Sequence, residues 1–255
     1  KIMELNLSNP IAGRNTKTVY RDNDKTIKLF VENYSKANVL NEALIQSRVE
    51  ENTDLSISKL IEVTKVQNRW ALVTEYIDGT PLDVLMKQHP EKEEEYLDLF
   101  VNIQLEILSR KVPLLNRTKD KYKRKLEDDS SIDENVKYDI LQRLEGMKNH
   151  NKLCHGDFIP SNIIIKENGE YAVIDWAHAT QGNSSADIAN TFLIFSMHGM
   201  QDLANRYVDM YCKKTGENKI EIQNWIPIVA AVRKTYDKEE EREFLDNWID
   251  ITDFQ

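Results

Sequence analysis

The 255-residue sequence predicts an α+β fold of two lobes, a small strand-rich lobe over residues 1–77 and a larger helical lobe over residues 78–255. Three observations predict this division. Short apolar runs and period-two alternation dominate the first part. The turn sequence DGTP at residues 78–81 ends it, because glycine allows a positive φ and proline presets the next one. Beyond that turn, apolar residues recur mostly at helical spacing.

The first lobe is expected to contain a small sheet and one helix. Its helix is predicted over residues 36–50, where Val39, Leu40, Ala43 and Ile45 cluster toward one side. Five segments show the alternation of half-buried strands: residues 3–7, 18–21, 26–31, 59–66 and 70–76.

The second lobe is expected to be helical, with one hairpin inside it. Helices are predicted over residues 91–110 and after Ser131, where Ser131 and Glu134 fit a capping box. The basic run at 119–125 is interpreted as a solvated helix face. Further segments complete the lobe: strands at 162–166 and 171–174, and helices from residue 186 onward with breaks at Gly216 and near Pro227.

The composition is that of a soluble globular protein, with 40% hydrophobic and 30% charged residues. The net charge of −9 argues against nucleic acid or an anionic membrane as the main partner. Cys154 and Cys212 form neither a disulfide framework nor a zinc pattern. No apolar run approaches the ~18 residues of a membrane span, and the N-terminus lacks the apolar core of a signal peptide, so a cytoplasmic location is expected.

The most informative stretch is HGDFIPSN at residues 155–162, followed by Asp175 after an apolar hairpin. Phosphoryl transfer from a metal–nucleotide needs one carboxylate to take the proton of the attacking hydroxyl, and hard oxygen ligands to hold Mg²⁺. Asp157, Asn162 and Asp175 supply these groups in order. Turn capping would explain a lone Asp or Asn, but the flanking His-Gly and the apolar strands favour the functional interpretation.

This stretch, with Ile174-Asp175-Trp176, resembles the aminoglycoside phosphotransferase family, which is similar in turn to choline kinases and more distantly to protein kinases. The resemblance implies a bilobal protein-kinase-like fold and an ATP- and Mg²⁺-dependent kinase of a small hydroxyl-bearing molecule. It implies that Asp157 is the catalytic base and that Asn162 and Asp175 are metal ligands. It further implies that His155 and Asp187 support the catalytic loop; Asp187 is also compatible with an N-cap.

Upstream, the resemblance assigns the nucleotide to Lys28 and to the segment between the lobes. Lys28 matches the lysine that contacts the α- and β-phosphates, and Glu42 in the following helix matches the acid that pairs with it. Glu32 and Glu50 remain alternative partners. The backbone from Glu75 to Ile77 resembles the hinge that offers C=O and N–H groups to adenine.

Two segments depart from the family pattern. The phosphate loop, expected at residues 8–17, has one glycine and no G-x-G-x-x-G, which leaves its contacts to the β- and γ-phosphates open. His178 stands where relatives often carry an acid; a structural imidazole is favoured over a substrate contact. A Walker A sequence is absent, which excludes a P-loop NTPase.

Two alternative functions are considered. A protein kinase would share Lys28 and the catalytic motif but should also show a DFG-type motif, an Ala-Pro-Glu anchor and a long activation segment, whereas about ten residues separate Asp175 from the next predicted helix. A pseudokinase acting as a binding or scaffold protein usually lacks the lysine, base or metal position, and none is missing here.

The acceptor is the least determined part of the prediction. Residues 237–255 hold eight acids and two bases, a balance of −6, which would suit a cationic acceptor such as an aminoglycoside, a choline-like molecule or an amino sugar. A solvated helix face explains the same charges equally well. Trp225 and Trp248 are candidates for stacking on a sugar or a quaternary ammonium, and equally for the core.

Overall fold

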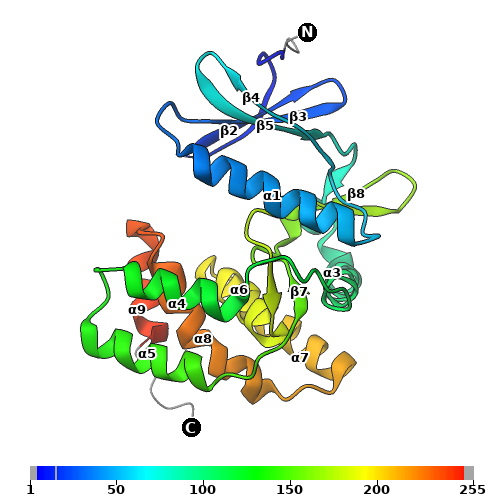
Figure 1. Cartoon of the computed structure of the whole chain (residues 1–255). Coiled ribbons are helices and arrows are strands. Elements are labelled where there is room, and N and C mark those ends of the chain that lie inside the picture. Colours follow the sequence, from blue (N-terminus) through cyan, green and yellow to red (C-terminus); the bar gives the residue numbers. More distant parts are fainter. Residues whose placement is uncertain (1–4, 15, 250–255) are drawn as a thin grey trace. The chain divides into compact units, whose positions relative to one another are not determined.

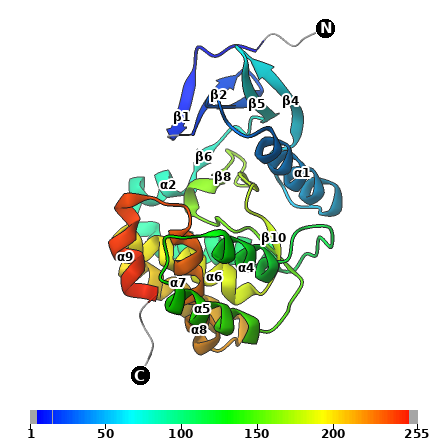
Figure 2. The same ribbon diagram turned by 60° about the vertical axis from the view of Figure 1, so that its left-hand side comes forward.

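A computed structural model describes residues 5–14 and 16–249, and its ribbon is drawn in Figures 1 and 2. The packing of the chain divides it into two compact units. Unit 1 comprises residues up to Pro90 together with Pro160–His178, and unit 2 comprises Glu91–Ile159 together with residues from Ala179 onward. A strand-rich first unit and a helical second unit confirm the predicted α+β class. The predicted lobe boundary between residues 77 and 78 is not tested by this division. The two units are not continuous in sequence, because Pro160–His178 belongs to unit 1.

Unit 1 is built on an antiparallel sheet in the order β1-β2-β3-β5-β4. Its strands are β1 (Pro10–Arg14), β2 (Lys17–Asp22), β3 (Lys25–Phe30), β4 (Leu60–Val66) and β5 (Arg69–Glu75). Helix α1 (Lys36–Asn52) contacts β4 and β5 and runs across the sheet in Figure 1. Ser35 caps α1 by accepting a hydrogen bond from the Asn38 N–H at 3.4 Å.

The alternation along β3 decides where its lysine points. Ile27 and Leu29 are buried on one face of the sheet with Ala71 and Val73. Phe30 packs on the other face with α1. Because side chains alternate along a strand, Lys28 shares the α1 face with Phe30.

Unit 1 also holds a second, three-stranded sheet in the order β6-β8-β9. It consists of β6 (Thr80–Pro81), β8 (Ile163–Ile165) and β9 (Tyr171–Val173), and helix α2 (Leu82–Gln88) follows β6. The β8–β9 hairpin confirms the two strands expected at residues 162–166 and 171–174. A Cβ on Gly79, whose φ is +158°, would lie 2.4 Å from the Ile165 carbonyl oxygen, so this close approach of β6 to β8 requires glycine.

Unit 2 is helical, with one short ladder. Its helices are α3 (Glu93–Leu108), α4 (Thr118–Asp128), α5 (Glu134–Gly146), α6 (Ser184–Met197), α7 (Gln201–Thr215), α8 (Lys219–Lys234) and α9 (Glu239–Ile249). Strands β7 (Lys152–Cys154) and β10 (Thr180–Gly182) pair antiparallel. Apolar side chains of α3, α6 and α7 form much of the core, with Phe100 contacting Phe158, Phe195 and Tyr207. No helix in the described part of the chain is both long and apolar enough to cross a membrane.

Three predicted details are wrong. Residues 5–7 are irregular rather than part of a strand; residues 3 and 4 lie outside the described residues. Helix α5 begins at Glu134 and its N-cap is Asp133, whose carboxylate accepts from the N–H groups of residues 135 and 136, so Ser131 caps nothing there. Pro227 lies inside α8 without ending it, and its neighbours on the helix are buried, so packing offsets the backbone hydrogen bond that proline cannot make.

Candidate functional site

The predicted nucleotide lysine lies in a cluster of charges within unit 1. The Lys28 ammonium donates to the Glu42 carboxylate from α1 and, at 3.0 Å, to Asp175 Oδ1. Glu42 is therefore the partner among the three acids considered. Of the other two, Glu50 accepts from the Leu60 N–H at 3.0 Å and Glu32 is exposed. Lys17, at the start of β2, adds a weaker ion pair to Asp175 Oδ2 at 3.7 Å.

These contacts fix the ionisation of the cluster. Burial lowers the pKa of Lys28, but Asp175 and Glu42 outweigh burial and leave that pKa above its usual value. Burial likewise raises the pKa of Asp175, and the Lys28 and Lys17 charges overcome it, so the net shift is downward. His178 contributes to the same downward shift. Asp175 therefore stays an anion at any physiological pH.

The hairpin places the two predicted metal ligands at one end. Ile163 pairs with Val173, and the Ile174 N–H donates to the Asn162 carbonyl at 2.9 Å. Ile174 therefore lies opposite Asn162, and Asp175 is the next residue in the chain. Asp175 adopts a left-handed backbone with φ of 61°, a conformation that costs energy for a residue other than glycine and that recurs at functional sites. The amide and carboxylate oxygens suit Mg²⁺, which prefers hard oxygen ligands.

The predicted hinge is extended but partly engaged. The Glu75 N–H donates to the Lys59 carbonyl at 2.8 Å, and its own carbonyl accepts from Ser58 Oγ at 2.5 Å. The Tyr76 N–H donates to the Asp24 carbonyl at 2.8 Å. Within the described residues, the Ile77 backbone makes no such bond, so it retains both groups for a ligand.

In the segment expected as the phosphate loop, β1 ends at Arg14 and β2 begins at Lys17, and residue 15 lies outside the described residues. Arg14 pairs with Lys17 and Gly13 with Thr18 between the two strands. The sequence interpretation assigned no role to Lys17, although it ends that loop. Burial and the nearby Lys28 lower the pKa of Lys17.

In unit 2, α6 presents one face to the predicted catalytic loop. Asp187 accepts from the Gly156 N–H at 2.8 Å and from the His155 N–H at 3.3 Å. One turn later, Asn190 donates to the Gly156 carbonyl at 3.0 Å, and Thr191 donates to the Phe158 carbonyl at 2.7 Å. Three side chains at helical spacing thereby fix the backbone on either side of Asp157.

His155 is fully buried and orients the next residues. Its Nδ1 accepts from the Asp157 N–H at 3.2 Å, which ties the ring to the backbone of the catalytic loop. The Asp157 carboxylate belongs to a half-buried residue. His155 and Asp187 thus both contact the backbone of the segment that carries Asp157, and their role as supports of that loop stays a prediction.

The supports behind Asp187 were not foreseen. Gln104 on α3 donates to Asp187 Oδ2 at 3.2 Å and accepts from the Tyr207 hydroxyl on α7. Burial raises the pKa of Asp187, while the Gly156 N–H, His155 and Gln104 counteract it. A buried glutamine in a helix carries no local signal of such a role, so sequence reasoning had no means of finding it.

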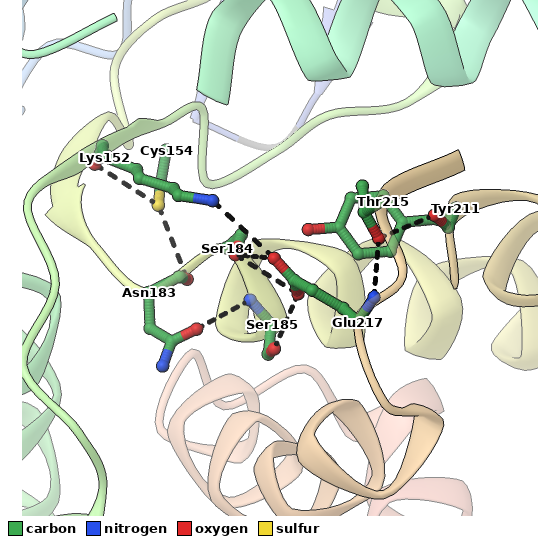
Figure 3. Close-up of polar contacts among 8 residues, drawn as sticks. All are labelled: Lys152, Cys154, Asn183, Ser184, Ser185, Tyr211, Thr215 and Glu217. Carbon is green, nitrogen blue, oxygen red and sulfur yellow. Dashed lines mark hydrogen bonds and ion pairs between the residues drawn. The ribbon is translucent and has the colours of Figure 1, made fainter. Parts of the chain in front are cut away.

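The N-terminus of α6 is anchored by a second polar cluster, drawn in Figure 3. Asn183 caps the helix by accepting from the Ser185 N–H at 2.9 Å. The Ser184 hydroxyl donates to Glu217 at 3.1 Å, and the Lys152 ammonium on β7 lies 3.6 Å from the same carboxylate. This cluster joins α6 to β7, the strand that leads into the catalytic loop.

Within the described residues, no group of three or more His, Cys, Asp or Glu side chains could hold a metal ion. Of the two predicted metal ligands, Asn162 and Asp175, only the aspartate is one of these residue types.

Solved structures with a similar fold have low sequence identity to this chain, so they support a comparison of fold alone.

Two solved structures illustrate the similarity of fold. A choline kinase, LicA from Streptococcus pneumoniae, is 15% identical with a TM-score of 0.65, covering 94% of this chain and 91% of the other. Aminoglycoside phosphotransferase APH(3'')-Id from Streptomyces rimosus, solved with ADP and streptomycin, is 14% identical with a TM-score of 0.58, covering 84% and 90%. Both show the protein-kinase-like fold for this chain.

No curated protein sequence matches the chain. The model of the phosphotransferase enzyme family, by contrast, matches residues 9–222, which include the Lys28 strand, the catalytic motif and Asp187. That match spans most of the sequence, and the chain therefore belongs to the phosphotransferase enzyme family.

Proposed function

We propose that this chain is a kinase that transfers the γ-phosphate of ATP, with Mg²⁺, to a hydroxyl of a small molecule. The observation that carries the proposal is the charge cluster of unit 1. There, Lys28 is held by Glu42 and Asp175, and Asp175 follows the hairpin end that also carries Asn162. A surface ion pair would not need a half-buried lysine between two carboxylates and a left-handed aspartate.

Each residue then has one role. Lys28, oriented by Glu42, binds the α- and β-phosphates of the nucleotide, and the Ile77 backbone binds the adenine edge with the Glu75 carbonyl. Asn162 and Asp175 would hold Mg²⁺. The ion, when bound, neutralises charge on the transferred phosphate. Asp157 accepts the proton of the acceptor hydroxyl, and His155 and Asp187 keep its loop in place.

The test measures nucleotide binding and turnover separately. Thermal unfolding with and without ATP and Mg²⁺ reports binding, and ADP release with a panel of alcohols reports transfer. We expect a higher unfolding temperature with Mg²⁺·ATP, and ADP release with at least one alcohol that Asp157→Ala abolishes. The matched control is Asp139→Ala, an exposed acid on α5. Nucleotide binding without turnover on any acceptor would support the scaffold alternative. If neither nucleotide binding nor ADP release is observed, the proposal is overturned.

We further propose that the acceptor is a cation. The structure leaves fewer acids to support this proposal than the eight counted in the sequence. Several acids of α9 are neutralised by neighbouring bases: Glu241 pairs with Arg233 at 2.9 Å, and Lys234 pairs with Asp246. Three exposed glutamates, Glu239, Glu240 and Glu243, form no ion pair within the described residues. These glutamates and the net charge of −9 support attraction of a cation.

The two candidate tryptophans differ in availability. Trp225 is 1% exposed and belongs to the core, so it offers no stacking face. Trp248 is half-buried and contacts Phe192 and Phe244 edge-on or tilted, at 5.5 and 6.1 Å between ring centroids. Of the two, Trp248 alone retains surface for an acceptor.

A further inference from the structure

Unit 2 contains a hollow of about 330 Å³ that none of the proposed roles uses. Six residues define its chemistry: Arg117, Lys119, Lys148, His150, Asn183 and Trp225. Its other described lining residues add a hydroxyl and further side-chain amides, but no carboxylate. A hollow with three cationic side chains and no acid in its lining contrasts with a chain whose net charge is −9.

Several elements converge to build the hollow. Arg117 and Lys119 stand at the start of α4, and Lys148 and His150 lie in the segment between α5 and β7. Contacts of α4 with α5, α8 and β10 bring these elements together, and the α4, α5 and α8 ribbons lie side by side in Figure 2. A Cβ on Gly182 would lie 2.1 Å from Thr118 Oγ1, so β10 approaches α4 too closely for any residue but glycine.

The hollow lies away from the catalytic loop within unit 2. In the β7–β10 ladder, Cys154 pairs with Thr180 and Lys152 pairs with Gly182. His155 therefore follows one end of the ladder, whereas Gly182 and Asn183 stand at the other. A ligand in the hollow would be distinct from the phosphoryl acceptor.

Four hydrogen-bond donors of the lining have no partner among the described residues. The Trp225 indole N–H is buried and makes no hydrogen bond. Arg117 and His150 are exposed, and their side chains make no hydrogen bond or ion pair there. The Asn183 carboxamide uses its oxygen to cap α6, as Figure 3 shows, and its NH₂ group makes no hydrogen bond within the described residues.

The two lysines of the lining are partly committed. Lys119 donates to the carbonyls of Glu145 and Met147 at 2.9 and 2.7 Å, and Lys148 lies 3.9 Å from the Glu221 carboxylate. The carbonyls leave the charge of Lys119 unneutralised. A neighbouring hollow shares Arg117 and Lys119 but is lined by three acids as well, so its charge is mixed.

A buried indole N–H without an acceptor is costly, and an acceptor supplied by a ligand would remove that cost. Guanidinium, imidazole, carboxamide and indole groups all donate to oxyanions, and the guanidinium fork matches phosphate and carboxylate in particular. We propose that this hollow binds a small molecule through an oxyanion group, phosphate or carboxylate, with Arg117, His150, Asn183 and Trp225 as its donors.

The test follows the Trp225 indole proton directly. The chain has four tryptophans, so a ¹⁵N-labelled sample gives four indole N–H signals, which Trp225→Phe assigns. If Trp225→Phe does not fold, replacing each of the other three tryptophans in turn assigns their signals, and the remaining signal belongs to Trp225. Glucose 6-phosphate and citrate serve as phosphate and carboxylate probes. We expect the Trp225 signal to move downfield with at least one of them, and the stronger probe identifies the group.

Two variants show whether the response comes from this hollow. Arg117→Ala should weaken the effective probe at least about tenfold, since it removes a charge-assisted hydrogen bond. Arg143→Ala, an exposed arginine on α5 outside the lining, should leave binding unchanged. Lys28→Ala should leave it unchanged too, which separates this hollow from the nucleotide site. No movement of Trp225 up to ~10 mM of either probe, or equal affinity in Arg117→Ala, would overturn the proposal.

Discussion

Lys28 shows what a single residue reveals in the sequence and what it does not. Its alternation with Ile27 and Leu29 places it on the opposite face of β3, and the family resemblance implied Glu42 as its partner, with Glu32 and Glu50 left open. Its second partner, Asp175, is 147 residues away, and Lys17 approaches the same carboxylate from another strand. Contacts over such separations depend on how the elements pack, which no local pattern encodes.

Asp157 and Asp175 should fail in different ways when replaced. Asp157→Ala should lower kcat at least about 10²-fold while nucleotide affinity stays close to wild type, because the carboxylate acts on the acceptor hydroxyl. Asp175→Ala should weaken Mg²⁺-nucleotide binding itself. Titration calorimetry with Mg²⁺·ATP and ADP-release kinetics distinguish the two. Wild-type turnover by Asp157→Ala would show that another group takes the proton.

Lys28 and Glu42 should behave as one unit. Lys28→Ala should reduce kcat/KM for ATP by about 10²-fold, and Glu42→Ala by less, because the acid acts through the lysine. In a Lys28→Ala background, Glu42→Ala should add little, so the two effects are not additive. Lys28→Arg is the control that keeps the positive charge, and thermal unfolding of each variant separates lost function from lost folding. Additive effects would contradict a shared role.

At the scale of elements, the sequence located most helices and strands but missed several ends. Ser131 and Asp133 both fit an N-cap; the structure uses Asp133, since the Ser131 N–H and hydroxyl donate to the Asp129 carboxylate. The basic run forms α4 as expected, yet its face is not wholly solvated. Burial, with Lys125 and Arg124 nearby, lowers the pKa of Lys121 to about 8. The neighbouring elements decide which side of a charged helix is buried, so the sequence of the helix alone does not predict that side.

The contact between α8 and α9 yields a prediction on stability. Arg233 forms two hydrogen bonds with the Glu241 carboxylate, at 2.9 and 3.1 Å. Burial raises the pKa of Glu241, but Arg233 and Lys238 outweigh it and lower the pKa below 4.5. Glu241→Gln should therefore lose about 1–3 kcal/mol of unfolding free energy at pH 7.

The pH dependence of that loss tests its cause. A carboxylate whose folded pKa is depressed stabilises fully above the unfolded value, and the stabilisation is lost as pH falls through the folded pKa. The difference between wild type and Glu241→Gln should thus shrink as pH falls below about 4.5. Urea unfolding of both proteins from pH 7 to about pH 2 measures it, because the loss occurs between the unfolded pKa and the lower folded pKa, and Glu243→Gln, an exposed neighbour, is the control. A difference that stays constant over that whole range would indicate a packing effect.

At the scale of the whole molecule, the two-lobed α+β class and the family could be predicted, because the motif and the change of periodicity are both local signals. That the β8–β9 hairpin belongs to unit 1 could not be predicted from the sequence. Its place in unit 1 comes from the pairing of Ile165 with Thr80, and backbone hydrogen bonds between such distant segments leave no trace in composition. The same limit applies to the α6 contacts that hold the catalytic loop.

The charge of the molecule leads to the last prediction. If exposed glutamates such as Glu239, Glu240 and Glu243 attract a cationic acceptor, kcat/KM should fall as salt rises, because screening shortens the reach of exposed charges to ~8 Å at physiological ionic strength. The measurement is a transfer screen over aminoglycosides, choline, homoserine, sugars and macrolides, with the best acceptor repeated at several salt concentrations. Replacing the three glutamates with glutamine should weaken the salt dependence, while the KM for ATP serves as the control. A neutral sugar or macrolide as best acceptor, with salt-independent kcat/KM, would rule out the cationic acceptor and leave the kinase proposal intact, since Lys28, Asp157 and Asp175 are tested separately.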